Sequence, residues 1–288
     1  MKLDGPMHES LPQEAEGRSL DRQLEHIRRY GMSTSPPDAR QRLLKALGIP
    51  KPKTTGRYLV KFGCHLPFSH PQLLRDCFKI IHLLGIDYTY LEKEYCCGSV
   101  PVMRNSGTER EEALSACKQF MQMNYDMARQ KGAETVVYIC PVCIHFAKGY
   151  FPTMDDHHIF VWDLIAENLE QRDLKITPTV MGYYGGCGGS RFRAVLHGAK
   201  PHWERYRQLM DKIEGLTIVD LANVCCTAGS ERLVREAKSK NIDNIICPCA
   251  ACYGHIEDVG DNRVHPVYLS DILLTAMESS PKHRTTVV

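Results

Sequence analysis

The sequence predicts an α/β protein built from two related β/α units. Short apolar runs with strand character alternate with longer segments whose apolar residues recur at helical spacing. This order occurs twice along the 288 residues. In both copies cysteines directly follow the apolar runs, as expected for a site at the C-terminal ends of parallel strands. We therefore expect one unit at about residues 56–172 and another at 176–288, with their cysteine-bearing edges facing a shared site.

Residues 1–55 form an extension that differs from the rest of the chain, because it is charged and broken by prolines. Apolar residues three and four apart predict a short helix over residues 19–30, and a second helix is expected over residues 39–47. The simpler interpretation is that these helices pack on the protein's own surface. The alternative is that they dock to another protein of a complex.

In the first unit, each predicted strand leads into cysteines. The strands and the cysteines that follow are residues 58–60 with Cys64, residues 88–91 with Cys96 and Cys97, and residues 135–139 with Cys140. Between them, one helix is predicted at residues 71–84 and ends at Gly85. A second helix is predicted at residues 109–131. A strand–helix alternation of this kind predicts a parallel sheet.

The second unit repeats this order. Its predicted strands and cysteines are residues 179–184 with Cys187, residues 216–219 with Cys225 and Cys226, and residues 242–246 with Cys247 and Cys249. Helices are expected at residues 203–210 and 230–240. Both units also close with a similar apolar segment, at residues 159–165 and 266–273. The parallel in order and local character indicates a repeat.

Charge and hydropathy narrow the class of protein. The 36 basic and 34 acidic residues leave a net charge of +2, so there is no global electrostatic reason to bind nucleic acid or a membrane surface. Residues 1–18 lack the apolar core of a secretory signal, and no run of about 18 apolar residues predicts a membrane span. We expect a cytoplasmic protein.

Ten of the thirteen cysteines fall into one pattern that is written twice. The pattern is a lone cysteine after glycine, an adjacent pair, and a C-x-x-C. The first cysteine set is Cys64, Cys96, Cys97, Cys140 and Cys143, and the second cysteine set is Cys187, Cys225, Cys226, Cys249 and Cys252. Disulfides are rare in a reducing compartment, so metal ligation is the better explanation. Soft thiolates select iron–sulfur clusters, zinc or copper(I).

The spacing favours a multi-iron cluster over a single ion. One structural zinc needs four ligands, so two C-x-x-C pairs on one zinc would leave six patterned cysteines unexplained. Adjacent cysteines point in different directions, and both can ligate one centre only if it is larger than one ion or the turn is tight. The C-x-x-C-x-x-C run of ferredoxins is absent, which argues against an ordinary cubane.

Each copy resembles the cysteine-rich CCG domain found in the B subunit of heterodisulfide reductase, whose pattern is a lone Cys, a Cys-Cys-Gly and a Cys-Pro-x-Cys. The likeness covers nearly everything after Arg57. It implies that each domain holds a noncubane [4Fe–4S] cluster through its five cysteines, and that two neighbouring clusters act directly on a disulfide. The cluster ligands would then be the ten cysteines of the two sets.

The second copy departs from the pattern. Between Cys97 and Cys140 lie 42 residues, whereas between Cys226 and Cys249 lie only 22. Thr227 also replaces the glycine that should follow the adjacent pair. Two registers of the final motif are open, and Cys247 could replace Cys249. We favour Cys249 with Cys252, because their spacing equals that of Cys140 and Cys143.

Other residues near the cysteines have candidate roles. His65 follows Cys64 directly and His145 lies two residues after Cys143, so either could donate to a cluster sulfur or a substrate thiolate. The ordinary alternative is a structural or exposed histidine. Cys77 and Cys117 lie in apolar-periodic helical stretches and are expected to pack in the core.

The resemblance implies the catalytic iron–sulfur subunit of a heterodisulfide-reductase-like complex, a disulfide oxidoreductase. Its partners would be a ferredoxin-like C subunit together with a flavin-containing A subunit, and its substrate a disulfide, a thiol or a lipoate-type sulfur. The N-terminal extension and the altered second motif favour the branch found in sulfur oxidisers. Two alternatives stay open: a single-cluster electron-transfer subunit with a degenerate second domain, and a non-redox, zinc-stabilised interaction module.

Overall fold

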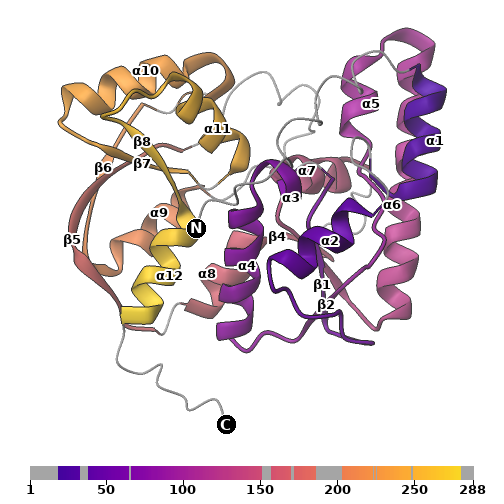
Figure 1. Ribbon diagram of the computed structural model, residues 1–288, viewed down its shortest axis with the longest axis horizontal. Helices are drawn as coiled ribbons and strands as arrows, with labels where there is room; N and C mark the ends of the chain where they lie inside the picture. The colour runs from indigo at the N-terminus through magenta and orange to yellow at the C-terminus, as the bar shows by residue number, and fades with distance from the viewer. Residues whose placement is uncertain are drawn as a thin grey trace. The chain divides into compact units, whose positions relative to one another are not determined.

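The chain is described by a computed structural model over residues 19–32, 38–64, 66–150, 157–169, 172–185, 203–222, 224, 226–247 and 249–279. Within these ranges it forms two four-stranded parallel sheets (Figure 1). Tertiary contacts divide the chain into two compact units. The first unit is Met1–Arg75 with Asp87–Phe160, and the second is Asp76–Ile86 with Val161–Val288.

The first unit contains a parallel sheet in the order β2-β1-β3-β4. Its strands are β1 (Tyr58–Lys61), β2 (Tyr88–Tyr90), β3 (Thr135–Tyr138) and β4 (His158–Phe160). Nearly all of their residues are buried, as expected of a parallel sheet covered on both faces. Tyr58 pairs with both Tyr88 and Thr135, so these three strands run in step. The loops that follow them, with their cysteines, therefore leave the same edge of the sheet.

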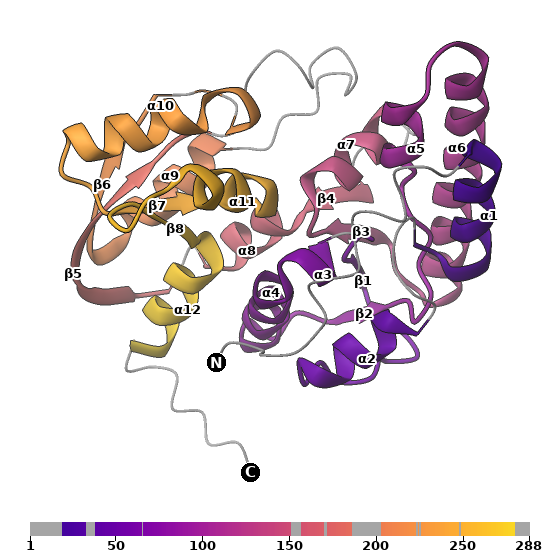
Figure 2. The same ribbon diagram turned by 45° about the horizontal axis from the view of Figure 1, so that its top comes forward.

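Helices surround this sheet. They are α1 (Leu20–Tyr30), α2 (Ala39–Ala46), α3 (Leu66–Ser69), α5 (Ser99–Arg104), α6 (Gly107–Gln130) and α7 (Pro141–Tyr150), and α4 (Pro71–Leu83) continues into the second unit. α1 lies against α5 and α6 in both ribbon views (Figures 1 and 2). Its buried face includes Leu20, Leu24 and Ile27. The helices of the extension thus pack on the protein's own surface, which is the simpler of the two interpretations.

The second unit contains a parallel sheet in the order β6-β5-β7-β8. Its strands are β5 (Leu174–Tyr183), β6 (Ile213–Asp220), β7 (Asn244–Cys247) and β8 (His265–Tyr268), and its helices are α8 (Val161–Leu169), α9 (Trp203–Asp211), α10 (Cys226–Ser239), α11 (Ala250–Val259) and α12 (Leu269–Ser279). The pairing of β5 with β6 shifts register between Lys175 and Thr179. Pro178 lies within this irregularity and has no N–H to donate.

The two sheets have the same topology, which confirms the predicted fold class of two pseudo-repeated β/α units. In each sheet the strands appear in the order second, first, third, fourth along the chain. Some boundaries differ from expectation. The helix expected from residue 230 begins at Cys226, so this cysteine opens a helix instead of ending a loop. The strand expected from residue 179 begins at Leu174.

None of the helices within the described ranges combines the length and the apolar character needed to cross a membrane.

Candidate metal centre

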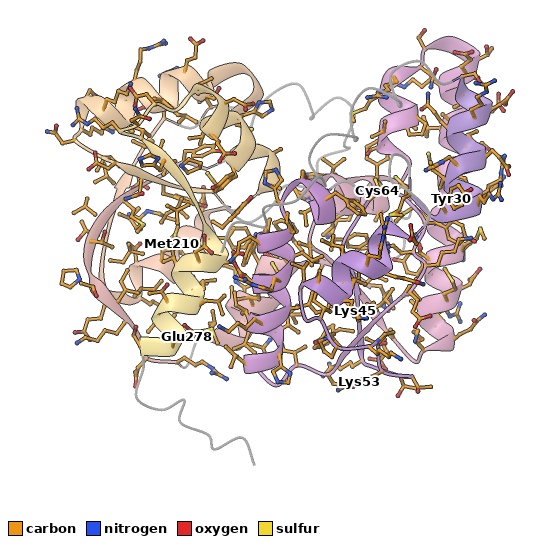
Figure 3. The ribbon with its side chains drawn as sticks, viewed as in Figure 1. Tyr30, Lys45, Lys53, Cys64, Met210 and Glu278 are labelled. Carbon is orange, nitrogen blue, oxygen red and sulfur yellow. The ribbon has the colours of Figure 1, made fainter. Side chains whose placement is uncertain are left out.

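The structure brings the first cysteine set together at the C-terminal edge of its sheet. The Sγ atoms of Cys64 and Cys96 lie 3.1 Å apart, and the Cys143 thiol donates to the Cys97 sulfur over 3.5 Å. Cys140 is within hydrogen-bonding reach of Cys143, and Cys96 of Cys97. Cys140 is half-buried and the other four are buried. Figure 3 labels Cys64 within this unit.

The glycine after the adjacent pair is required by geometry. Gly98 has a φ of 77°, in the left-handed region that side chains disfavour. A Cβ at this position would lie 1.6 Å from the Sγ of Cys117, which is fully buried on α6. The Gly98 amide also donates to the Cys96 sulfur at 3.4 Å. Cys117 therefore packs in the core, directly behind the loop that carries the cysteine pair.

Three separate elements hold the segment before the pair. Asn124 of α6 accepts from the Tyr95 amide at 2.7 Å and donates to the Tyr95 carbonyl at 2.8 Å. The Cys96 amide donates to the carbonyl of Gly31, at the end of α1, at 2.7 Å. Lys61, the last residue of β1, donates to the Tyr95 carbonyl at 2.6 Å. These bonds fix the backbone from which both thiols project.

A buried charge cluster adjoins these thiols, and sequence reasoning missed it. Glu94 accepts from the amides of Phe62 and Gly63 at 3.2 and 2.6 Å, so it clamps the loop that leads to Cys64. Arg40 of α2 lies 3.0 Å from Glu94, and the Lys61 ammonium lies 3.6 Å from it. All three charged side chains are almost fully buried. A lysine inside an otherwise apolar strand was the available signal.

The pKa shifts show which side chains of this buried charge cluster are ionised. Burial works against the charge of Lys61, but Glu94 first, and then the neighbouring sulfurs of Cys143, Cys97 and Cys96, outweigh it, so the pKa of the Lys61 ammonium is raised. Burial likewise disfavours the Glu94 carboxylate, but Arg40 and Lys61 reverse this and its pKa is lowered. Both groups are therefore charged at neutral pH.

Hydrogen bonds between the thiols select one thiolate. The pKa of Cys97 lies well below its usual range, because the thiols of Cys143 and Cys96 donate to its sulfur. The pKa of Cys96 is raised by its hydrogen bond with Cys64, and that of Cys143 by its hydrogen bond with Cys140. A thiolate is the form that binds metals, so Cys97 is prepared as a ligand.

The second cysteine set is described in part. Cys187 and Cys225 lie outside the described residues, as does His65. Cys226, Cys249 and Cys252 are buried. A hydrogen bond from Cys252 lowers the pKa of Cys249, which is the N-cap residue of α11.

Cys247 has different surroundings. It is the last residue of β7, and its thiol is directed at the carbonyl of Ile245 at 3.5 Å. Burial and the charges of Cys249 and Cys226 raise its pKa well above the usual value. Its position in the sheet matches that of Tyr138 at the end of β3. The choice of Cys249 with Cys252 as the ligand pair stays a prediction.

His145, the other candidate histidine, lies on α7 and is buried. Burial, aided by Lys148, lowers its pKa to about 4, so the imidazole is neutral at pH 7. Its Nδ1 atom has no hydrogen-bonding partner in the described part of the chain.

The donor set fits an iron–sulfur cluster by its chemistry. Five thiols and no oxygen ligand converge in the first unit, and soft thiolates are the ligands that hold such clusters. Considering the described residues only, no three His, Cys, Asp or Glu side chains form a group suited to a single metal ion.

Comparisons with known proteins agree with the cysteine pattern of the first unit. Residues 58–146 match the cysteine-rich domain family CCG. The C subunit of anaerobic glycerol-3-phosphate dehydrogenase from Escherichia coli, strain K12, is 26% identical over 243 residues, which cover 72% of this chain and 56% of the relative. The same protein from Escherichia coli O157:H7 matches equally well. The chain thus spans little more than half the length of these relatives.

Among solved structures, glutamate racemase from Francisella tularensis subsp. tularensis SCHU S4 matches with a TM-score of 0.33 and 11% identity, covering 78% of this chain and 80% of the racemase. A likeness of this size supports no functional inference.

Proposed function

We propose that this protein is an iron–sulfur redox subunit of a larger complex, and that its first cysteine set holds a noncubane [4Fe–4S] cluster. The observation that carries the proposal is the convergence of five thiols, four of them buried, at one edge of a parallel sheet. The match of residues 58–146 to the CCG family supports it. So does the likeness to a named subunit of an anaerobic dehydrogenase.

The residues of the first unit would bind the cluster and keep water away from it. Cys64, Cys96, Cys97, Cys140 and Cys143 would be the ligands. When bound, such a cluster supplies one-electron redox chemistry. Asn124 holds the segment that leads to Cys96, and Glu94 holds the loop that leads to Cys64. The thiols would therefore stay in place when the charge of the site changes. The amide of Gly98 would offer a hydrogen bond to a ligand sulfur.

At a finer level, we propose heterodisulfide-reductase-like thiol/disulfide chemistry with a second noncubane cluster on Cys187, Cys225, Cys226, Cys249 and Cys252. The lowered pKa of Cys249 and its contact with Cys252 support this second ligand set. Cleavage of a disulfide takes two electrons, which two one-electron centres can supply in turn. The substrate would be a disulfide, a thiol or a lipoate-type sulfur, and His65, next to Cys64 in the sequence, is the candidate donor to it. A ferredoxin-like C subunit together with a flavin-containing A subunit would deliver electrons.

A second candidate is a single-cluster electron-transfer subunit with a degenerate second unit. The family match favours it, because it covers only the first unit. The altered second motif, with Thr227 inside α10, points the same way. By analogy with the named relative, the partners would then be the other subunits of a dehydrogenase.

Iron, acid-labile sulfide and zinc per chain, measured on protein purified without oxygen, test these proposals. About eight iron and eight sulfide would support two [4Fe–4S] clusters, and about four of each would support the single-cluster carrier. Zinc with little iron under anaerobic expression would overturn both and favour a zinc-stabilised interaction module. Reduction of a disulfide by the loaded protein, with dithionite as electron donor, separates the disulfide oxidoreductase from the carrier.

A further inference from the structure

Lys61 and Tyr184 occupy matching positions in the two units. Each lies three residues before the lone cysteine of its set. Lys61 ends β1, and Tyr184 directly follows β5, which are the equivalent strands of the two sheets. Thiols at matching places in the two motifs act on their pKa values: Cys97 and Cys143 on Lys61, and Cys226 and Cys252 on Tyr184.

The buried charges beside the cysteine loops are unequal in number. Two cations, Arg40 and Lys61, share one carboxylate, Glu94, as their ion-pair partner. A buried charge is costly unless an opposite charge compensates it. Arg40 lies 3.0 Å from Glu94, whereas Lys61 lies 3.6 Å from it and donates to the carbonyl of Tyr95, the residue before Cys96. Lys61 thus places a positive charge that Glu94 must share next to the loop of the cysteine pair.

The second unit offers a neutral group at the matching place. Tyr184 is 1% exposed, and burial raises the pKa of its phenol above the ordinary value of about 10. It is therefore uncharged at neutral pH. The sequence counterpart of Glu94, two residues before the adjacent cysteine pair, is Asn223, which is also neutral.

We propose that Lys61 is a fixed cation that raises the reduction potential of the first centre, a role that the neutral Tyr184 does not supply at the matching place of the second unit. The inference rests on the proposed function, because it requires a cluster on the first cysteine set. Reduction adds one negative charge to a buried site. A cation held in low-dielectric surroundings stabilises that added charge more than a neutral phenol does. Lys61 acts on the potential through its charge and is a positioning residue, not a catalytic one.

The test is a redox titration of the anaerobically purified full chain, with dithionite as reductant and electron paramagnetic resonance as the readout. Lys61→Met removes the cation and keeps a long side chain. We expect the equilibrium constant for one-electron reduction of the first centre to fall about tenfold, which corresponds to about 59 mV. Lys61→Arg keeps the charge and should stay close to wild type. Lys45→Met, an exposed lysine on α2 labelled in Figure 3, is the matched control.

Glu94→Gln should shift the reduction potential of the first centre in the opposite direction. It leaves two buried cations without their carboxylate, and the amide oxygen still accepts from Gly63. We expect the first centre to become easier to reduce. This variant keeps the question open to test if Lys61→Met binds no iron, because it changes the buried charge beside the thiols in the opposite sense. Circular dichroism and the iron content must match the wild type for the shift to count. Tyr184→Phe, which changes no charge, should leave the signal of the first centre unmoved.

The outcomes separate the two proposals. An unchanged potential in a fully loaded Lys61→Met protein, or a fall in Glu94→Gln, would overturn the role of Lys61 and leave the iron–sulfur function intact. Wild-type protein without iron and sulfide would overturn the proposed function, and this inference with it.

Discussion

The two units share a strand order and a cysteine motif, yet the surroundings of their thiols differ. In the first unit, Lys61 and Glu94 place charges beside the thiols, and the loop after the adjacent pair turns at a left-handed glycine. In the second, Tyr184 stands where Lys61 would be, and Cys226 is itself the first residue of α10. The repeated fold thus keeps the described cysteines of the two sets after the strands of each sheet, while single flanking residues decide the charge around them.

The largest expected effect is on iron content. Cys97→Ser removes the thiolate that the first unit prepares, so we expect loss of the iron bound there, about four atoms per chain. Cys226→Ser is the matching change in the second unit. If both units carry clusters, each variant loses about half of the iron.

Cys117→Ser, a buried cysteine outside both sets, controls for the loss of any cysteine and should keep all the iron. If Cys97→Ser and Cys226→Ser each lost all the iron, the two cysteine sets would form a single centre. The comparison between the two units would then fail.

The next effect is on stability. Arg40→Leu breaks the buried ion pair with Glu94 and detaches α2 from the loop before Cys64. Removal of one partner of a buried pair costs about 3–5 kcal/mol. Urea denaturation followed by circular dichroism measures it, and Arg42→Leu, an exposed arginine on the same helix, is the control. A change below about 1 kcal/mol would mean that the extension is not needed to hold the site.

Gly98→Ala tests whether the first unit needs the left-handed glycine after its cysteine pair, where the second unit has Thr227. The left-handed φ costs about 1–3 kcal/mol for a residue with a side chain, and the overlap with Cys117 adds to that. Gly48→Ala has a similar φ of 67° and open space around it, so it reports the backbone strain alone. We expect Gly98→Ala to be the more destabilising of the two and to lose iron. Equal effects would show that the contact with Cys117 is unimportant.

The smallest expected effect is a loss of stability in acid, which arises from a histidine of the first unit that the second unit lacks at the matching position. His158 of β4 is fully buried between the hydroxyls of Tyr125 and Tyr138, and burial lowers its pKa to about 4. The unfolded chain takes up this proton near pH 6.5, so the free energy of unfolding falls as the pH drops from 6.5 towards 4, by about 2 kcal/mol at pH 5. The matching residue of β8 is Pro266, which does not titrate.

Urea denaturation of wild type and His158→Gln between pH 7 and pH 4.5 checks this. The variant should show the flatter dependence on pH. Parallel curves would assign the acid sensitivity to other groups, of which His145 is the first to test.

Local patterns predicted the framework but not the charges within it. Strand runs that end at Cys64, Cys96 and Cys140 were visible because parallel strands place their C-terminal ends at one edge. Arg40 looked like one more charge on a polar helix, since nothing nearby reveals a partner 54 residues away. Glu94 was hidden for the same reason. The start of α10 at Cys226 was missed because Thr227, Ala228 and Gly229 have no helical apolar pattern.

The hydrogen bond from the Cys96 amide to the Gly31 carbonyl and the ion pair of Arg40 with Glu94 bear on how this site could be transplanted. The stretch that matches the CCG family begins at residue 58, after both of these anchors. A chimera that grafts only the family stretch onto a new protein would carry every thiol of the first set and leave out part of what holds them. Relatives without a segment equivalent to residues 19–57 must hold the same loops with other residues. Residues that replace Gly31 and Arg40 should therefore be sought outside the stretch that the family match covers.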